Sequence, residues 1–283
     1  MTYVSLNNIY NLIKDFFEEH EIEDIEPEKV HQESFEKIPV WIYWDQGFEN
    51  APELVQMCVK SIEKNLPYDK VELIKLTKEN LSDYVVLPDY VYDHFGNNLT
   101  FVSNIIRAAL LTNYGGMWFD ATYLLVKQLD PTIFDREFWA IQRCYYSSKD
   151  QKCLYDFSYN LCYFQPNNEV MHFMYQALCT YCKYKERLDC YFIKDGIIVY
   201  GYKHDKYDKK YVDDAVVDQR SIEGLYGPNL NKYYSPTEMI RLQQDGTYIF
   251  KLTYKGAKIY ESIQGKKTIW GYLKEKYLLD FPV

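Results

Sequence analysis

Three polar side chains lie near one another in the sequence and are of types that could do chemistry together: Asn104, Arg107 and Asp120. A carboxylate such as Asp120 can hold a divalent cation through oxygen, and that cation can clamp a diphosphate. The guanidinium of Arg107 can pair in a fork with phosphate or sugar hydroxyls. Residue types alone leave a second interpretation open, in which Arg107 and Asp120 form a structural ion pair beside a turn.

A helix is predicted to carry two of these groups. Ser103 is a good N-cap, because its side-chain oxygen can accept from the first free amides of a helix. The apolar residues after it repeat at helical spacing over about three turns. Asn104 and Arg107 are three residues apart, so they share one face of the first turn.

A short strand is predicted to carry the third group. Gly115 and Gly116 end the helix, since glycine enters the left-handed conformation without strain. The apolar run at residues 117–119 is too short for a helix and predicts a buried strand. Asp120 then stands at the carboxyl end of that strand, where open α/β sheets bind their ligands.

Strands and helices alternate along the rest of the chain, which predicts an α/β fold with a mostly parallel sheet flanked by helices. The predicted strands are Val40–Tyr43, Val71–Leu76, Phe138–Arg143 and Tyr159–Phe164, and the predicted helices are Pro52–Asn65 and Glu169–Lys185. An amphipathic helix and an acidic linker precede them, so we expect a helical extension over residues 1–35 and one domain over residues 36–283. We expect that helix to pack on the body rather than lie in a membrane interface, because its polar face is poor in lysine and arginine.

The loop after the first predicted strand suits a nucleotide. Gly47 permits close approach of the backbone to a ligand. Asp45 and Gln46 could hydrogen-bond a base or a ribose. Tyr43 or Trp44 could stack on a base, and strand alternation turns one of the two inward. The alternative is that the aromatic rings belong to the core and Gly47 only turns the chain.

Polar groups farther along the chain could complete such a site. Lys251, Thr253 and Lys255 alternate along a strand-like segment, where they could cover a diphosphate. Surface lysine is the alternative for at least one of the two lysines. Asn160 lies at a strand edge, where its amide could bond a sugar or satisfy the backbone.

Three motifs resemble those of a known family. The run S-N-I-I-R-A-A-L-L-T-N-Y-G-G-M-W-F-D-A-T at Ser103–Thr122 is similar to the shared motif of sugar-transferring enzymes with a DXD signature. K-I-P-V-W-I-Y-W-D-Q-G at Lys37–Gly47 is similar to their first strand and nucleotide loop, and I-F-K-L-T-Y-K at Ile249–Lys255 to their C-terminal segment. Together they resemble bacterial capsular polysaccharide synthesis glycosyltransferases, related to the glycosyltransferase 32 group. They resemble more distantly the glycosylating domains of large clostridial toxins.

The resemblance implies a Rossmann-type fold of the GT-A class and a glycosyltransferase activity. Such an enzyme moves a sugar from a nucleotide-diphosphate sugar to a hydroxyl of a growing glycan, with retention at the anomeric carbon. A UDP-sugar is the favoured donor, and a glycan or a lipid-linked oligosaccharide is the acceptor.

The resemblance also implies residue roles. Asp120 and Thr122 would hold Mn²⁺ or Mg²⁺, and Arg107, Asn104 and Asn160 would orient the donor sugar. The remaining donor-binding residues would be Tyr43, Trp44, Asp45, Gln46, Gly47, Lys251, Thr253 and Lys255. Two positions depart from the family pattern. Asn104 replaces an acidic residue, and Thr122 supplies a neutral hydroxyl instead of a second carboxylate, so we expect weaker metal binding.

Composition limits the classes of partner. The net charge of −9 over 283 residues argues against nucleic acid and against tethering to anionic lipid by charge alone. No apolar run reaches the ~18 residues of a membrane span, and Lys14 and Asp15 interrupt any leader-like apolar stretch. We therefore expect a cytoplasmic protein, free or at the inner face of the membrane. The C-T-Y-C at Cys179 and Cys182 has no second such pair, so we expect reduced, structural thiols.

Two other functional classes remain open. A carbohydrate-binding or nucleotide-sugar-binding protein could keep the fold with weak or no turnover, and Asn104 and Thr122 motivate that alternative. A glycoside hydrolase would need a second carboxylate across a cleft from Asp120, and the sequence identifies none.

Overall fold

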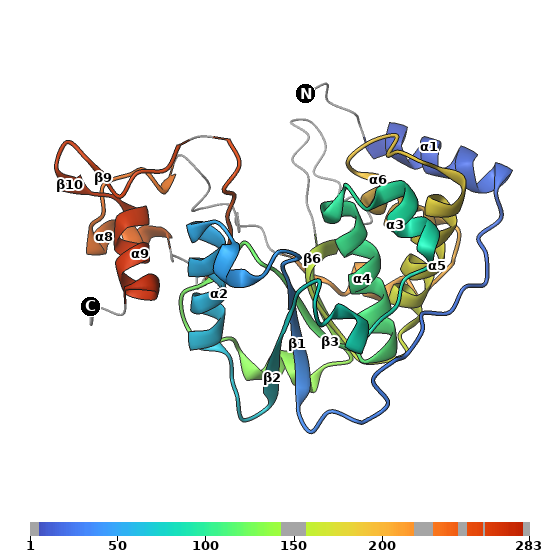
Figure 1. Cartoon of the computed structure of the whole chain (residues 1–283), viewed down its shortest axis with the longest axis horizontal. Helices are drawn as coiled ribbons and strands as arrows, with labels where there is room; N and C mark the ends of the chain where they lie inside the picture. Colours follow the sequence, from blue (N-terminus) through green and yellow to red (C-terminus); the bar gives the residue numbers. More distant parts are fainter. Residues whose placement is uncertain (1–5, 143–156, 218–228, 243–247, 257, 280–283) are drawn as a thin grey trace.

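The computed structural model describes residues 6–142, 157–217, 229–242, 248–256 and 258–279 (Figure 1). At its centre is a six-stranded sheet with the strand order β2-β1-β3-β6-β5-β7. The bounds are β2 Val71–Leu76, β1 Ile38–Tyr43, β3 Gly116–Asp120, β6 Phe157–Phe164, β5 Phe138–Gln142 and β7 Val216–Val217. β1 runs parallel to β2 and β3, and β5 to β7, whereas β6 is antiparallel to β3 and β5. The predicted α/β fold with a mostly parallel sheet is confirmed.

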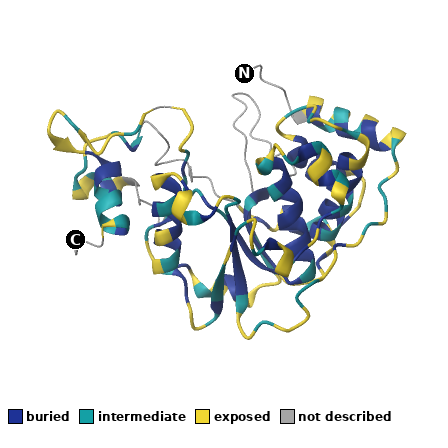
Figure 2. Ribbon diagram, in the orientation of Figure 1, coloured by how far each residue is buried: buried dark blue, intermediate teal, exposed yellow. Residues whose placement is uncertain are grey.

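Helices cover both faces of this sheet (Figure 1). One core lies between the sheet and a layer made of α3 Asp89–Phe95, α4 Leu99–Asn113, α5 Glu169–Tyr184 and α6 Ile193–Lys203, with α1 Leu6–Glu19 on its outside. A second core lies between the opposite face and α2 Glu53–Asn65. Trp41 and Tyr43 of β1 join the first core, and Val40 and Ile42 join the second, as strand alternation requires. Figure 2 shows the central strands as buried.

A smaller cluster joins the C-terminal segment to α2. α9 Ile269–Leu278 packs on α2, and β4 Tyr123–Leu125 pairs antiparallel with β8 Ile249–Lys251. α8 Pro236–Leu242 and the pair β9 Ser262–Ile263 and β10 Lys266–Lys267 lie on the same side of the molecule (Figure 1). The remaining short elements are η1 Phe48–Asn50, η2 Leu81–Asp83, η3 Pro131–Asp135 and α7 Lys210–Asp213. This arrangement returns the chain after residue 248 to the loop that follows β3.

The apolar stripe of α1 is buried against the body. Ile9 and Ile13 lie against Gly196 of α6, where an added Cβ would come within 2.7 Å and 2.9 Å of their side chains. The acidic linker then runs beside α5, where Glu23 pairs with Lys183 at 2.8 Å. The expectation that this helix packs on the body is confirmed, and the domain boundary at residues 35 and 36 stays a prediction. Among the described residues, every helix falls short of the length and the apolar character that a membrane span requires.

α4 begins before the residue that the sequence suggests. Asn98 is its N-cap, and Asn98 Oδ1 accepts from the Phe101 amide at 3.2 Å. Ser103 lies inside the helix, where its hydroxyl donates to the Thr100 carbonyl at 2.8 Å. The prediction of Ser103 as the N-cap is therefore wrong. Asn98 is an equally good cap, and burial of Phe101 and Val102 favours the longer helix.

Gly115 and Gly116 connect α4 to β3, as predicted. Their φ values are 63° and 91°, which favour glycine. A Cβ on Gly115 would lie 2.5 Å from the Pro166 nitrogen, and one on Gly116 would lie 2.2 Å from the Pro39 carbonyl oxygen. Close backbone approach and positive φ therefore both require glycine here. The tight connection sets β3 beside β1 and brings Asp120 to the end of its strand.

Candidate active site

β1 and β3 end side by side at one edge of the sheet. In their parallel register, Tyr43 is the partner of Asp120. β6 is antiparallel to β3 and pairs Leu161 with Phe119, so the preceding residue, Asn160, lies next to Asp120. Asp120 thus stands at the carboxyl edge of the sheet, where the loops after β1 and β3 meet the first half of β6.

Both carboxylate oxygens of Asp120 are bound by cationic side chains. Oδ1 accepts from Arg107 Nη2 at 2.7 Å and from Trp118 Nε1 at 2.9 Å. Oδ2 accepts from Lys251 Nζ at 2.7 Å. Hydrogen bonds between charged partners at these lengths are among the strong ones in proteins. We call Asp120, Arg107, Trp118 and Lys251 the Asp120 cluster. The ion pair between Arg107 and Asp120, which the sequence left open, is present. Lys251 is a second cation bound to the same carboxylate.

Arg107 is enclosed by its surroundings. Its side chain is 1% exposed, and its guanidinium carbon lies 4.7 Å from the ring centre of Trp118 and 4.5 Å from that of Tyr159. Within the described residues, its Nε has no hydrogen-bond partner. Two aromatic contacts and a carboxylate therefore hold the guanidinium in one place. Direct contact between Arg107 and a ligand would require these rings to move.

Asn104 is also engaged inside the protein. Its Oδ1 accepts from Arg107 Nη1 at 3.3 Å, and its Nδ2 donates to the Thr100 carbonyl at 3.3 Å. The Asn104 carbonyl accepts from the Tyr159 hydroxyl at 2.8 Å, which ties α4 to β6. The structure thus brings Asn104 and Arg107 together on one helix face, as predicted, but turns both toward the interior.

Lys251 approaches Asp120 from a different part of the chain. It is the last residue of β8 and is paired in register with Tyr123 of β4, whose ring centre lies 4.6 Å from its Nζ. The Leu252 amide donates to the Thr122 carbonyl at 2.9 Å, so one further backbone hydrogen bond ties the residue after β8 to the residue before β4. The side chains of Lys251 and Asp120 are 28% and 26% exposed. This side of the cluster therefore reaches solvent.

The cluster keeps Asp120 ionised. Burial alone would raise the pKa of this carboxyl, but the charges of Lys251 and Arg107 and the hydrogen bonds from Lys251 and Trp118 lower it to about 2. Two cations then face one carboxylate, so these groups together carry one positive charge in excess. A partly exposed positive charge at this edge of the sheet suits an anionic ligand.

The same donor set fits a divalent cation poorly. Each oxygen of Asp120 already accepts from a cationic group, and Thr122 offers only a neutral, half-buried hydroxyl. No group of three or more His, Cys, Asp and Glu side chains in the described residues could hold a metal ion. One ammonium about 4 Å from a doubly charged ion repels it by about 8 kcal/mol at an effective dielectric constant of about 20. Binding of Mn²⁺ or Mg²⁺ by Asp120 and Thr122 stays a prediction that this arrangement does not favour.

The loop after β1 places one aromatic ring inward and one outward, as strand alternation predicts. Tyr43 is buried, and its hydroxyl donates to Asp45 Oδ1 at 2.6 Å. Burial and that hydrogen bond raise the pKa of Tyr43 well above its usual range. Trp44 is half-buried, Gln46 is exposed, and Gly47 turns the chain at a φ of 84°. Trp44 is thus the ring of this loop that a ligand can reach.

The C-terminal segment meets the same loop. The Tyr254 ring lies 5.9 Å from the Trp44 ring, edge to face, and Tyr254 is 39% exposed. The strand ends at Lys251, so the prediction that Thr253 and Lys255 continue it is wrong. The Lys255 amide instead donates to the Thr253 hydroxyl at 3.2 Å, because a threonine side chain can close a local turn. Lys255 is exposed, while Lys251 is directed to Asp120.

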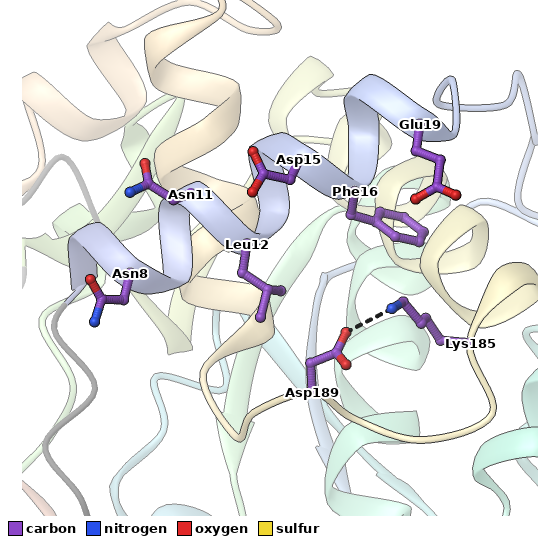
Figure 3. A pocket seen from close by; sticks show the side chains of 8 residues that line it. All are labelled: Asn8, Asn11, Leu12, Asp15, Phe16, Glu19, Lys185 and Asp189. Atoms are coloured by element: carbon purple, nitrogen blue, oxygen red, sulfur yellow. Dashed lines mark ion pairs between the residues drawn. The ribbon is translucent and has the colours of Figure 1, made fainter.

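A pocket of about 530 Å³ lies elsewhere, between α1 and the segment after α5 (Figure 3). It is lined by Asn8, Asn11, Leu12, Asp15, Phe16, Glu19, Lys185 and Asp189. Asp189 is held there by Lys185 at 3.2 Å and by the Tyr181 hydroxyl at 3.0 Å. None of the lining residues belongs to the Asp120 cluster, so this pocket is separate from the candidate active site.

The C-T-Y-C pair lies within α5. Cys179 and Cys182 are both buried. Burial raises the pKa of Cys179 to about 12 and that of Cys182 further, so both thiols stay protonated at neutral pH. Their burial in the core agrees with a structural role, and their reduced state stays a prediction.

Sequence reasoning missed three aromatic residues of the site. Trp118 lies two residues before Asp120 in β3, so strand alternation places both side chains on one face and could have revealed it. Tyr254 lies within the C-terminal motif, but its contact with Trp44 depends on the pairing of β8 with β4. Tyr159 reaches Arg107 from β6, and no local pattern indicates that contact.

Sequence comparison relates this chain to a protein family and to a curated protein. The family model described as capsular polysaccharide synthesis protein matches residues 2–272. Among curated proteins, glycosyltransferase afumC of Aspergillus fumigatus (strain CBS 144.89 / FGSC A1163 / CEA10) is 30% identical over 104 residues. That match covers 32% of this chain and 26% of the fungal protein, so it spans about a quarter of the relative.

Two solved structures are more distantly similar. PaToxG glycosyltransferase has a TM-score of 0.40 at 13% identity, and the match covers 86% of this chain and 95% of that one. The apo structure of the WbbM bifunctional glycosyltransferase has a TM-score of 0.48 at 9% identity, with coverage of 89% and 51%.

Proposed function

This chain belongs to the capsular polysaccharide synthesis protein family, and from that premise we propose that it is a glycosyltransferase of the GT-A type. It transfers a sugar from a nucleotide-diphosphate sugar to a hydroxyl of a growing glycan. The acceptor is a glycan or a lipid-linked oligosaccharide, and the enzyme works in the cytoplasm, free or at the inner face of the membrane.

The observation that carries this proposal is the excess positive charge of the Asp120 cluster at the carboxyl edge of the sheet. Lys251 is 28% exposed there, and the segment that follows it contacts the loop after β1 through the rings of Tyr254 and Trp44. A diphosphate leaving group gains negative charge as the sugar departs. A cation at that position stabilises the transition state more than the ground state.

Aromatic groups next to this charge support a nucleotide as the other part of the donor. Trp44 and Tyr254 form an edge-to-face pair in which Trp44 is half-buried and Tyr254 exposed. A base can stack on such a ring, and uracil in a UDP-sugar is the base we favour. The Tyr43 hydroxyl holds Asp45 in place, which leaves its second oxygen for a ribose or base edge.

Other residues orient the donor sugar, either by direct contact or through Asp120. Asn160 lies beside Asp120 on β6 and can hydrogen-bond a sugar hydroxyl. Arg107 and Asn104 are buried and act on the donor through the orientation of Asp120. Precise orientation lowers the entropic part of the barrier. We further propose same-face attack of the acceptor hydroxyl, which retains the anomeric configuration.

The lowered pKa of Asp120 excludes this carboxyl as the general acid of a glycoside hydrolase. A glycoside hydrolase needs one protonated carboxyl group as its general acid. Asp120, with a pKa of about 2, is ionised at neutral pH and has no proton to give. A binding protein without turnover remains the second candidate, because Asn104 and Thr122 depart from the family pattern.

A nucleotide-release assay tests this proposal. The purified chain is incubated with a panel of UDP-, GDP-, ADP- and dTDP-sugars, with and without Mn²⁺, and free nucleotide is measured. We expect release with one or a few donors, stimulated by an acceptor, and a loss of about 10³-fold in Asp120→Ala. Asp69→Ala, an exposed carboxylate in the turn before β2, is the matched control and should retain activity.

Two outcomes would overturn the assignment. Binding of a sugar nucleotide without any release indicates a binding protein. Cleavage of a glycan without a nucleotide donor indicates a hydrolase.

A further inference from the structure

We propose that the ammonium group of Lys251 takes the place of a divalent cation in this enzyme, so that sugar transfer proceeds without a metal. The inference rests on the proposed function. It assigns Asp120 a new task, which is to hold the ammonium group of Lys251 toward the donor diphosphate rather than to bind a metal.

The geometry places Lys251 where Asp120 would present a metal. Its Nζ lies 2.7 Å from Asp120 Oδ2, and Arg107 binds the other oxygen. The ammonium also lies over the ring of Tyr123, whose centre is 4.6 Å away. A carboxylate and an aromatic face thus hold one positive charge at the solvent-reaching side of the cluster.

The other oxygen of Asp120 cannot easily be released to a metal. Oδ1 is held by Arg107 and Trp118, and Arg107 is 1% exposed between two rings. Moving its guanidinium away would leave a charge buried without a partner, which is costly. Even if Lys251 swung outward, Asp120 would offer one oxygen beside a fixed cation. Thr122 adds no charge to compensate.

Sugar transfer can proceed without a metal, because the leaving group accepts both the electron pair of the broken bond and the proton of the acceptor. The bond between the anomeric carbon and the diphosphate oxygen breaks, and its electron pair stays on that oxygen. The acceptor hydroxyl oxygen forms the new bond to the anomeric carbon, and its proton passes to the departing diphosphate oxygen. Lys251 keeps its proton and offsets the charge that develops on the leaving group. Because Lys251 ends β8 and is followed by the turn at Thr253, its side chain can shift from Asp120 to the diphosphate.

The main test is turnover with and without metal. Protein freed of metal on a chelating resin is assayed for nucleotide release in EDTA and in Mn²⁺ or Mg²⁺. We expect the wild-type rates to agree within about twofold, and Lys251→Met to lose at least about 100-fold in every condition. Lys251→Arg keeps the charge and should regain part of the rate. Turnover that stops in EDTA and returns with Mn²⁺, or full activity of Lys251→Met, would overturn the proposal.

A matched lysine controls for loss of surface charge. Lys127 also lies 4.6 Å from a tyrosine ring centre, that of Tyr248, but contributes nothing to the Asp120 cluster. Lys127→Met should behave as the wild type, and thermal unfolding should show that Lys251→Met is folded.

Nucleotide binding separates this inference from the proposed function. Calorimetry with UDP does not depend on turnover, and we expect the same affinity in EDTA and in Mn²⁺, with weaker binding in Lys251→Met. If UDP binds only in the presence of Mn²⁺, the role proposed for Lys251 is wrong. The glycosyltransferase assignment is not affected by that result. Absence of binding and turnover with every nucleotide rejects the proposed function and this inference with it.

Discussion

Arg107 and Lys251 bind the same carboxylate from opposite surroundings. Arg107 comes from the middle of α4, is 1% exposed and is stacked between Trp118 and Tyr159. Lys251 comes from the end of the three-residue strand β8 and is 28% exposed. The distances to the carboxylate are the same, 2.7 Å in each case.

The difference indicates a division of labour between two cations. A guanidinium with aromatic contacts and no access to solvent has little freedom and maintains the orientation of Asp120. An ammonium on a flexible stem at the surface can exchange one anionic partner for another at small cost. Equal hydrogen-bond lengths therefore do not imply equal roles. The buried Arg107 supports the structure, whereas the partly exposed Lys251 can contact a ligand.

Removal of the Asp120 carboxylate, which both cations bind, should have the largest effect on stability. Asp120→Asn leaves the buried Arg107 without its counter-charge, and we expect the free energy of unfolding to fall by about 3–5 kcal/mol. Urea unfolding followed by circular dichroism measures this loss. Asp69→Asn, at the opposite end of the strands, is the control and should match the wild type. If Asp120→Asn were as stable as this control, Arg107 would not depend on Asp120.

Substitution of each cation by methionine compares the two sides directly. We expect Arg107→Met to lower the free energy of unfolding by about 2–3 kcal/mol, because a buried network is broken while Asp120 keeps Lys251. Lys251→Met should cost less than about 1 kcal/mol, since the pair is partly exposed. Urea titrations of both variants give the two values. Equal losses would contradict the division of labour.

The pH dependence should report the stabilisation that both cations give to Asp120. The pKa of this carboxyl is lowered from its ordinary value of 3.8 to about 2. Its contribution is therefore fully present above about pH 4 and is lost as the pH falls toward 2, with a total of about 2 kcal/mol. The stability difference between the wild type and Asp120→Asn should narrow over this range in urea titrations. A difference that stays constant from pH 4 to pH 2 would show that the carboxyl titrates normally.

Loss of a surface ion pair should have the smallest effect on the stability of the fold. Glu23 in the acidic linker pairs with Lys183 of α5 at 2.8 Å, and that lysine is 46% exposed. Both partners remain hydrated when the pair is broken, so Glu23→Gln should leave the urea midpoint unchanged within error. A clear drop in the midpoint would mean that exposure alone does not separate the two kinds of ion pair.

Much of the fold could be predicted because its signals are local. The strand at residues 71–76 and the helix that ends at Asn65 follow from apolar periodicity. Gly115 and Gly116 mark the end of α4, since positive φ and contact with Pro39 and Pro166 exclude larger residues. The start of α4 could not be predicted as well, because Asn98 and Ser103 are both good caps and only core packing decides between them.

The sequence by itself determined the helix–glycine–strand unit that presents Asn104, Arg107 and Asp120, because these residues are neighbours along the chain. Only the tertiary structure decided what surrounds them. Lys251 is 131 residues from Asp120 and reaches it through the pairing of β8 with β4. Tyr159 of β6 packs on Arg107. Arg107, which the sequence suggested as a sugar ligand, is therefore buried and holds Asp120 in place instead. Contacts between distant segments depend on strand register and packing, which no local spacing encodes.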